Sequence, residues 1–115
     1  MFFKDSEIKL DRVDDNTLRK TLAYGDGLMN TLCIFERGLD VNATIPFHQH
    51  EQVQTTYVLK GSFKFAIKYA DHVDVQTVNV GDSIYFPSNH EHGCIPLEDD
   101  SRLIDSFNPI REDFL

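Results

Sequence analysis

The sequence has little cysteine, no low-complexity tract and no long apolar run. Cys33 and Cys94 are the only cysteines, and they lie far apart without a CxxC spacing. Disulfide scaffolds are much denser in cysteine, so we expect two reduced thiols. No stretch approaches the roughly 18 apolar residues that a membrane helix needs. The first five residues become charged by the fourth and lack the apolar core of a signal peptide, which predicts a cytoplasmic protein.

Positive charge is also scarce. Eleven Lys and Arg stand against nineteen Asp and Glu, which gives a net charge of −8. Such a surface repels phosphate backbones and anionic membranes, so we expect neither nucleic acid nor membrane as a partner. At 115 residues the chain is long enough for one domain, predicted to span residues 1–115.

Short β-strands are the dominant predicted element. They are rich in β-branched and aromatic residues or alternate between apolar and polar, and Gly, Asp or Pro stands between them. The predicted strands cover residues 28–35, 55–59, 62–69, 73–80, 83–86 and 103–107. Only residues 11–18 show a weak helical turn, in an acidic and polar opening. The pattern predicts an all-β sandwich or barrel.

Four of the five histidines form two pairs, His48-Gln49-His50 and His90-Glu91-His92. Residues i and i+2 share one face of a strand, so each pair can direct two imidazoles into one space. Neutral imidazole is the commonest protein ligand of borderline divalent metals. The two pairs therefore indicate a metal site, although we expect His90 to face solvent, with a place in the pocket lining as the alternative. His72, in a turn beside Asp71, is expected at the surface.

The residues around these pairs resemble the two motifs of the cupin family. From His48 the spacing is HxH, three residues, Gln54, six residues and Gly61, in a first motif of about residues 38–61. The second motif, about residues 81–94, has Gly81, five residues, Pro87, and His92 five residues later. The resemblance implies a double-stranded β-helix, the jelly-roll barrel of cupins.

On this resemblance the metal ligands are His48, His50, Gln54 and His92. They would hold a divalent ion, and the set suits Zn, Ni, Mn, Co or Fe equally well. The alternative is a cupin without metal, its histidines bonded to neighbours. Glu51 follows His50 directly, so we expect it on the opposite side, in solvent.

Three positions depart from the family pattern. The spacer from Gly38 to His48 is longer than usual, which puts in doubt whether Gly38 is the motif glycine. Asn89 replaces a glycine, but Asn tolerates a positive φ. Gln54 replaces the usual Glu, and an amide oxygen is a neutral ligand that cannot accept a proton. The loss of this carboxylate argues against a two-histidine, one-carboxylate oxygenase and favours Lewis-acid chemistry on an anionic substrate.

The last predicted strand places a carboxylate among apolar residues. Asp105 shares a face with Leu103 and Phe107, so it must find a partner or serve a function. One alternative is a structural pair between Asp105 and Arg111. The other comes from the pattern D-x-F-x-x-x-R, which with Gln at the ligand position resembles small cupins of the pectin-degradation KdgF type.

That resemblance implies ring opening and ketonisation of 4,5-unsaturated uronates released by pectate and alginate lyases. The implied catalytic residues are Asp105, Phe107 and Arg111. Asp105 would be the acid/base, its pKa raised by the apolar face around it. Arg111 would orient the substrate carboxylate with a bidentate fork, and Phe107 would pack on the sugar and exclude water.

Two other function classes stay open. One is another metal-dependent cupin enzyme, an oxygenase or isomerase acting on a different small acid. The other is a non-catalytic cupin that binds a small anion or sugar. In each, the partner is a small anionic carbohydrate or carboxylate. We also expect a homodimer, with the N-terminal strand region available to a neighbour's sheet edge.

Four aromatic residues between the motifs, Tyr57, Phe65, Tyr85 and Phe86, are expected either to line the same pocket or to pack in the core.

Overall fold

The computed structural model describes residues 1–115 and is built almost entirely from β-strands. The strands are β1 (Leu10–Arg12), β2 (Thr17–Tyr24), β3 (Met29–Phe35), β4 (Val53–Lys60), β5 (Ser62–Lys68), β6 (Val73–Asn79), β7 (Ser83–Phe86), β8 (His92–Pro96) and β9 (Ser101–Asn108). Two short 3₁₀ helices, η1 (Asp5–Glu7) and η2 (Glu112–Phe114), lie near the ends of the chain. No helix is long and apolar enough to cross a membrane.

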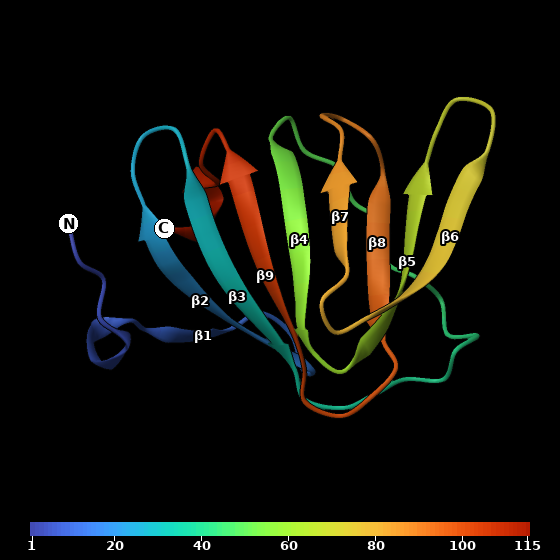
Figure 1. The fold of residues 1–115 in the computed structure, drawn as a ribbon, viewed down its shortest axis with the longest axis horizontal. Helices are drawn as coiled ribbons and strands as arrows, with labels where there is room; N and C mark the ends of the chain where they lie inside the picture. Colours follow the sequence, from blue (N-terminus) through green and yellow to red (C-terminus); the bar gives the residue numbers. More distant parts are fainter.

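The strands form two antiparallel sheets (Figure 1). The larger sheet has the order β1-β2-β3-β9-β4-β7, and the smaller has β6-β5-β8. Strand β9 lies between β3 and β4, so residues from the end of the chain enter the middle of the larger sheet. The predicted all-β fold is confirmed, and each of the six predicted strands is present within two residues of its predicted ends.

The apolar core lies between the sheets and depends on the alternation of β5. Its residues Phe63, Phe65 and Ile67 are buried, as the period-two pattern predicts. They pack against Val58 and Phe86 of the larger sheet. Phe65 also lines the main pocket, so the core continues directly into the site.

Two of the four aromatic expectations are wrong. Tyr57 and Tyr85 are 45% and 56% exposed on the outer face of the larger sheet, and neither lies in the core or lines the pocket that contains the histidines. Their strand neighbours Val58 and Phe86 are fully buried. Because side chains alternate along a strand, burying Val58 and Phe86 turns the adjacent tyrosines outward.

The start of the chain also differs from its prediction. The helical turn expected over residues 11–18 is absent, and this segment instead contains β1, a loop and the first residues of β2. Strand β2 was not predicted, because its sequence lacks a regular alternation of apolar and polar residues. Residues such as Thr17 and Arg19 line the pocket, so polar side chains take the inward positions where an ordinary strand has apolar ones.

Turns at the motif residues depend on positive φ. Gly61, between β4 and β5, has φ 77°, and Gly81, before β7, has φ 93°. Asn89 has φ 59°, as its tolerance of this region predicted.

Strand β8 was not predicted, because a glycine and a proline weaken its β pattern. Gly93 is needed there because a Cβ would collide with the carbonyl oxygen of Pro46. The absence of a side chain therefore lets the loop before β4 lie against β8, which is how His48 reaches the site.

Candidate metal centre and substrate pocket

Three histidines converge at one end of the space between the sheets. One nitrogen from each of His48, His50 and His92 lies within 4.8 Å of the others. His48 and His92 are joined by an isolated β-bridge, in which each backbone N–H donates to the other's carbonyl at 2.9 Å. The first histidine pair thus directs both rings into the site, but from a loop and not from the expected strand.

The second pair contributes only His92. His90 lies outside the cluster with its ring 5.4 Å from that of Tyr69, while His72 is exposed and contacts Asp71. Glu51 is exposed as expected. The surface position expected for His72 is therefore confirmed, whereas His90 is half-buried beside Tyr69 and lies neither in solvent nor in the pocket lining.

Backbone carbonyls orient two of the three rings. His50 Nδ1 lies 2.9 Å from the Gln52 carbonyl, and His92 Nδ1 lies 2.9 Å from the His90 carbonyl. A proton on each Nδ1 leaves Nε2 with a free lone pair, as in metal-ligating histidines. His92 Nε2 is buried and has no hydrogen-bond partner.

The histidines are held in the neutral form that a metal requires. Burial lowers the pKa of His92 to about 4, and desolvation followed by the nearby His50 lowers the pKa of His48. The pKa of His50 is also lowered, by desolvation and then by the positive charge of Arg111. At neutral pH the site therefore presents lone pairs instead of positive charge.

Gln54, in β4, turns its oxygen toward these rings. Its Nε2 donates to Thr56 Oγ1 at 2.9 Å and to Asp105 Oδ1 at 3.2 Å, so Oε1 faces His50 Nε2 at 3.0 Å. A neutral His50 carries only one N–H, although its two ring nitrogens face two oxygens, the Gln52 carbonyl and Gln54 Oε1. When Nδ1 carries the proton, the lone pair of Nε2 faces the lone pair of Gln54 Oε1. A divalent cation held by His50 Nε2 and Gln54 Oε1 would satisfy both lone pairs. The donor set and the unpartnered His92 nitrogen therefore fit a divalent metal.

Asp105, in β9, lies directly behind Gln54 and is 8% exposed. Its Oδ1 accepts from Thr56 Oγ1 at 2.5 Å and from Gln54 Nε2, and its Oδ2 accepts from the thiol of Cys33 at 3.6 Å. Burial raises the pKa of Asp105, and these donors oppose that rise. The result is a carboxylate with an increased affinity for protons inside a pocket.

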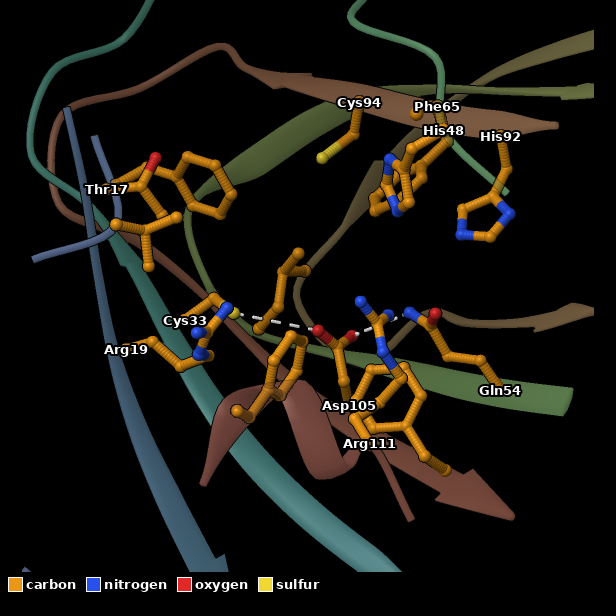
Figure 2. A pocket seen from close by; sticks show the side chains of 16 residues that line it. Thr17, Arg19, Cys33, His48, Gln54, Phe65, His92, Cys94, Asp105 and Arg111 are labelled. Carbon is orange, nitrogen blue, oxygen red and sulfur yellow. Dashed lines mark hydrogen bonds between the residues drawn. The ribbon is translucent and has the colours of Figure 1, made fainter. Parts of the chain in front are cut away.

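The pocket that joins these groups has a volume of about 180 Å³ and lies next to the histidines (Figure 2). Its walls include His48, Gln54, His92, Asp105, Phe107 and Arg111. Six of the seven predicted ligand and catalytic residues line this pocket, and His50 is the only one of the seven outside the lining.

The alternative that Arg111 forms a structural pair with Asp105 is wrong. Arg111 instead pairs with Asp113, through Nε at 3.0 Å and Nη2 at 2.9 Å. Its guanidinium also lies 4.3 Å from the ring of Phe114 and 5.4 Å from that of Phe107. The tail after β9 therefore fixes Arg111 in the pocket wall and leaves Asp105 without a counter-ion.

Four residues of the site were missed by the sequence analysis: Arg19, Cys33 and Phe114 in the pocket wall, and Thr56, which bonds to Asp105 behind it. Thr56 could have been found, because it lies two residues after Gln54 on the same face of the same strand. Cys33 was considered only as a reduced thiol, which it is. Arg19 and Phe114 reach the pocket from β2 and η2, two elements that the pattern did not reveal.

The fold and site are those of cupins, and the comparisons with known proteins agree. The family model described as a cupin domain matches residues 36–105. The chain belongs to the cupin family.

Among curated proteins, the chain is similar to the pectin degradation protein KdgF of Dickeya dadantii, with 33% identity over 99% of this chain and 97% of that protein. Among solved structures, it is similar to KdgF from a Halomonas species, with a TM-score of 0.85, 33% identity and full coverage of both chains. An RmlC-like cupin from Shewanella frigidimarina has a TM-score of 0.84 at 26% identity, covering 99% of this chain and 95% of that one. These likenesses confirm the predicted jelly-roll fold.

Proposed function

We propose that the chain accelerates ring opening and ketonisation of 4,5-unsaturated uronates, sugar acids released from pectin or alginate by lyases. The observation that carries this proposal is the arrangement of Gln54, whose oxygen faces His50 of the histidine cluster while its amide nitrogen donates to buried Asp105. A metal-ligand set and a proton-transfer group thus share one pocket. The similarity to KdgF proteins over the whole chain supports the same substrate class.

His48, His50, Gln54 and His92 would hold the divalent ion. When bound, such an ion stabilises negative charge that develops on a substrate oxygen. The amide of Gln54 leaves the ion's positive charge uncompensated, which suits an anionic substrate. The resulting prediction is a Lewis-acid site and no requirement for oxygen.

Asp105 is proposed to move the proton. In ring opening, the anomeric hydroxyl loses its proton to the carboxylate, C1 becomes a carbonyl, and the bond from C1 to the ring oxygen breaks. The electron pair of that bond leaves an enolate at C5, and C4 then takes up a proton to give the ketone. The proton accepted by Asp105 balances the one delivered to C4, so the reaction is an isomerisation without net proton release.

Arg111 and Phe107 are proposed to position the sugar. Asp113 engages one edge of the Arg111 guanidinium, and the Nη1 side stays available for a substrate oxygen. Phe107 is 3% exposed and lies 5.6 Å from the ring of His50, so it places an apolar surface beside the metal ligands. Such a surface would pack against the sugar and exclude water.

Two further parts of the proposal concern the molecule in the cell. The free thiols Cys33 and Cys94 suit a reducing compartment, which supports a cytoplasmic location that cell fractionation can test. A homodimer is proposed because β1 forms an edge of the larger sheet. A monomer mass in sedimentation at high protein concentration would refute the proposed homodimer.

The function is tested with metal-loaded protein and fresh unsaturated uronate made by a lyase. Loss of the ultraviolet absorbance of the enol ether is followed with the wild type, His48→Ala, Asp105→Asn and no protein. We expect rapid loss only with the wild type. Loss at the spontaneous rate with confirmed metal content would refute ketonisation, and full activity of Asp105→Asn would remove its acid/base role. Oxygen uptake would favour an oxygenase, and binding without product would favour a sugar-binding cupin.

A further inference from the structure

Arg19 lies in the wall of the pocket on the side away from the histidines (Figure 2). It comes from β2, where it pairs across the sheet with Cys33 of β3. In Figure 2, Arg19 and Cys33 lie at one side, His48 and His92 at the other, and Asp105 between them. A ligand that reaches from the histidines past Asp105 would therefore meet the guanidinium of Arg19.

Arg19 is the pocket arginine without a carboxylate partner. Arg12, Arg102 and Arg111 each form an ion pair with an acidic side chain, and Arg37 is exposed. Arg19 has no carboxylate oxygen within 4.0 Å, although the chain has nineteen Asp and Glu. Its Nε is buried and has no hydrogen-bond partner.

An aromatic ring, and no acid, holds this guanidinium in place. The Cζ atom of Arg19 lies 3.5 Å from the ring centre of Phe114, which also contacts Arg111. Stacking on an aromatic face restrains the planar fork and leaves its N–H groups free to donate. Phe114 packs in turn on Phe107, at 5.7 Å between ring centres.

The two pocket arginines differ in how closely an acid pairs with them. Asp113 forms two hydrogen bonds with Arg111, whereas its charge acts on Arg19 only from beyond ion-pair distance. Buried donors and charges are unfavourable unless they are paired, and a carboxylate pairs best with a planar guanidinium. In a chain of net charge −8, this local positive charge would attract an anion to the pocket.

We propose that Arg19 binds the carboxylate of the sugar acid and makes the pocket select an acidic over a neutral sugar. This inference rests on the proposed function, because it takes a uronate as the ligand. Arg111 then contacts another oxygen of the sugar, and the two arginines hold it across Asp105. The fork of Arg19, fixed by Phe114, orients the carboxylate in a plane that a lysine cannot define.

The test is a binding measurement that needs no turnover. Titration calorimetry compares D-galacturonate, a saturated uronate, with D-galactose for metal-loaded wild type, Arg19→Gln, Arg19→Lys and Arg37→Gln. We expect the wild type to bind galacturonate at least tenfold more tightly than galactose. Arg19→Gln should lose this preference without changing galactose binding, and Arg19→Lys should keep only part of it. Arg37→Gln, which removes the same charge from the surface, should match the wild type.

Kinetics with the unsaturated uronate add a second readout. Arg19→Gln should raise KM tenfold or more and change kcat less than threefold, because the carboxylate is bound alike before and during ring opening. A wild type without preference for galacturonate, or an Arg19→Gln variant that keeps it, would overturn the proposal. Galacturonate binding that depends on Arg19 in a protein that never turns over unsaturated uronate would instead refute the proposed function alone.

Discussion

Replacing Thr56 with valine should destabilise the protein through one charged hydrogen bond. Thr56 is 1% exposed, donates to Asp105 at 2.5 Å and accepts from Gln54 at 2.9 Å. Valine has nearly the same shape, so packing is preserved while the buried carboxylate loses its shortest hydrogen bond. A hydrogen bond to a charged group contributes about 2 kcal/mol, so we expect Thr56→Val to lower the free energy of unfolding by about 2 kcal/mol at pH 7.

The loss of unfolding free energy caused by Thr56→Val should increase as pH rises. Asp105 has a raised pKa in the folded protein, so its ionisation destabilises the fold as pH rises through that pKa. Thr56→Val removes a donor to the charged form and raises the pKa further. The difference between variant and wild type in the free energy of unfolding should therefore be largest at pH 7 and become smaller toward pH 4, as Asp105 takes up a proton.

The assay is urea denaturation of metal-free protein at pH 7 and pH 4. A loss of about 2 kcal/mol corresponds to a fall of about 10 °C in Tm for a domain of this size. Thr55→Val is the matched control, because Thr55 is exposed on the same strand and should change stability little. Equal losses for Thr56→Val at both pH values, or no loss at pH 7, would refute the reasoning about Asp105.

Three further predictions test the histidine, amide and glycine positions. The pKa of His92 is about 4 in the folded protein, against 6.5 for an ordinary histidine. Because the unfolded chain takes up this proton first, the free energy of unfolding of the metal-free protein should fall by about 3 kcal/mol between pH 6.5 and pH 4. In urea denaturation, the free energy of unfolding of His92→Asn should fall less with pH than that of the wild type. The same pH dependence in both proteins would contradict the lowered pKa of His92. Gln54→Glu would place a second carboxylate beside Asp105, which lies 3.2 Å from the amide nitrogen. In Gln54→Glu, metal titration should show tighter metal binding, and the ultraviolet assay should show at least tenfold lower activity at pH 7. Unchanged activity of this variant would count against Asp105 as the proton carrier. In Gly93→Ala the added Cβ would collide with a backbone carbonyl, so urea denaturation should show a free energy of unfolding lower by about 3 kcal/mol. Gly25→Ala is the control and should change stability little, because nothing lies within 4 Å of its added Cβ.

The strands with regular alternation were predictable from the sequence, as β5 shows. Phe63, Phe65 and Ile67 recur at every second position, and all three are buried in the core. Strand β2 was not predictable by the same rule, because Thr17 and Arg19 serve the pocket from inward positions. The pattern that identifies a strand is thus weakest where the strand contributes to the site.

The candidate site was predictable where the spacing itself carries chemistry. His48, His50 and His92 follow cupin spacing and come together in space. The partner of Arg111 was not predictable, since Asp105 and Asp113 are both within reach in sequence and only the turn after β9 decides between them. Contacts between distant elements, such as Phe114 on Arg19, depend on tertiary packing that no local pattern encodes.

The central claim is that a metal held by the histidines and Gln54 serves ketonisation of an unsaturated uronate. Proton NMR of 4,5-unsaturated galacturonate tests it most directly, because the vinyl proton at C4 reports the enol ether and the product signals report the open ketone. We predict that metal-loaded wild type converts the first signals to the second much faster than His48→Ala or chelator-treated protein. Equal rates in all three samples, with metal confirmed in the wild type, would contradict the claim.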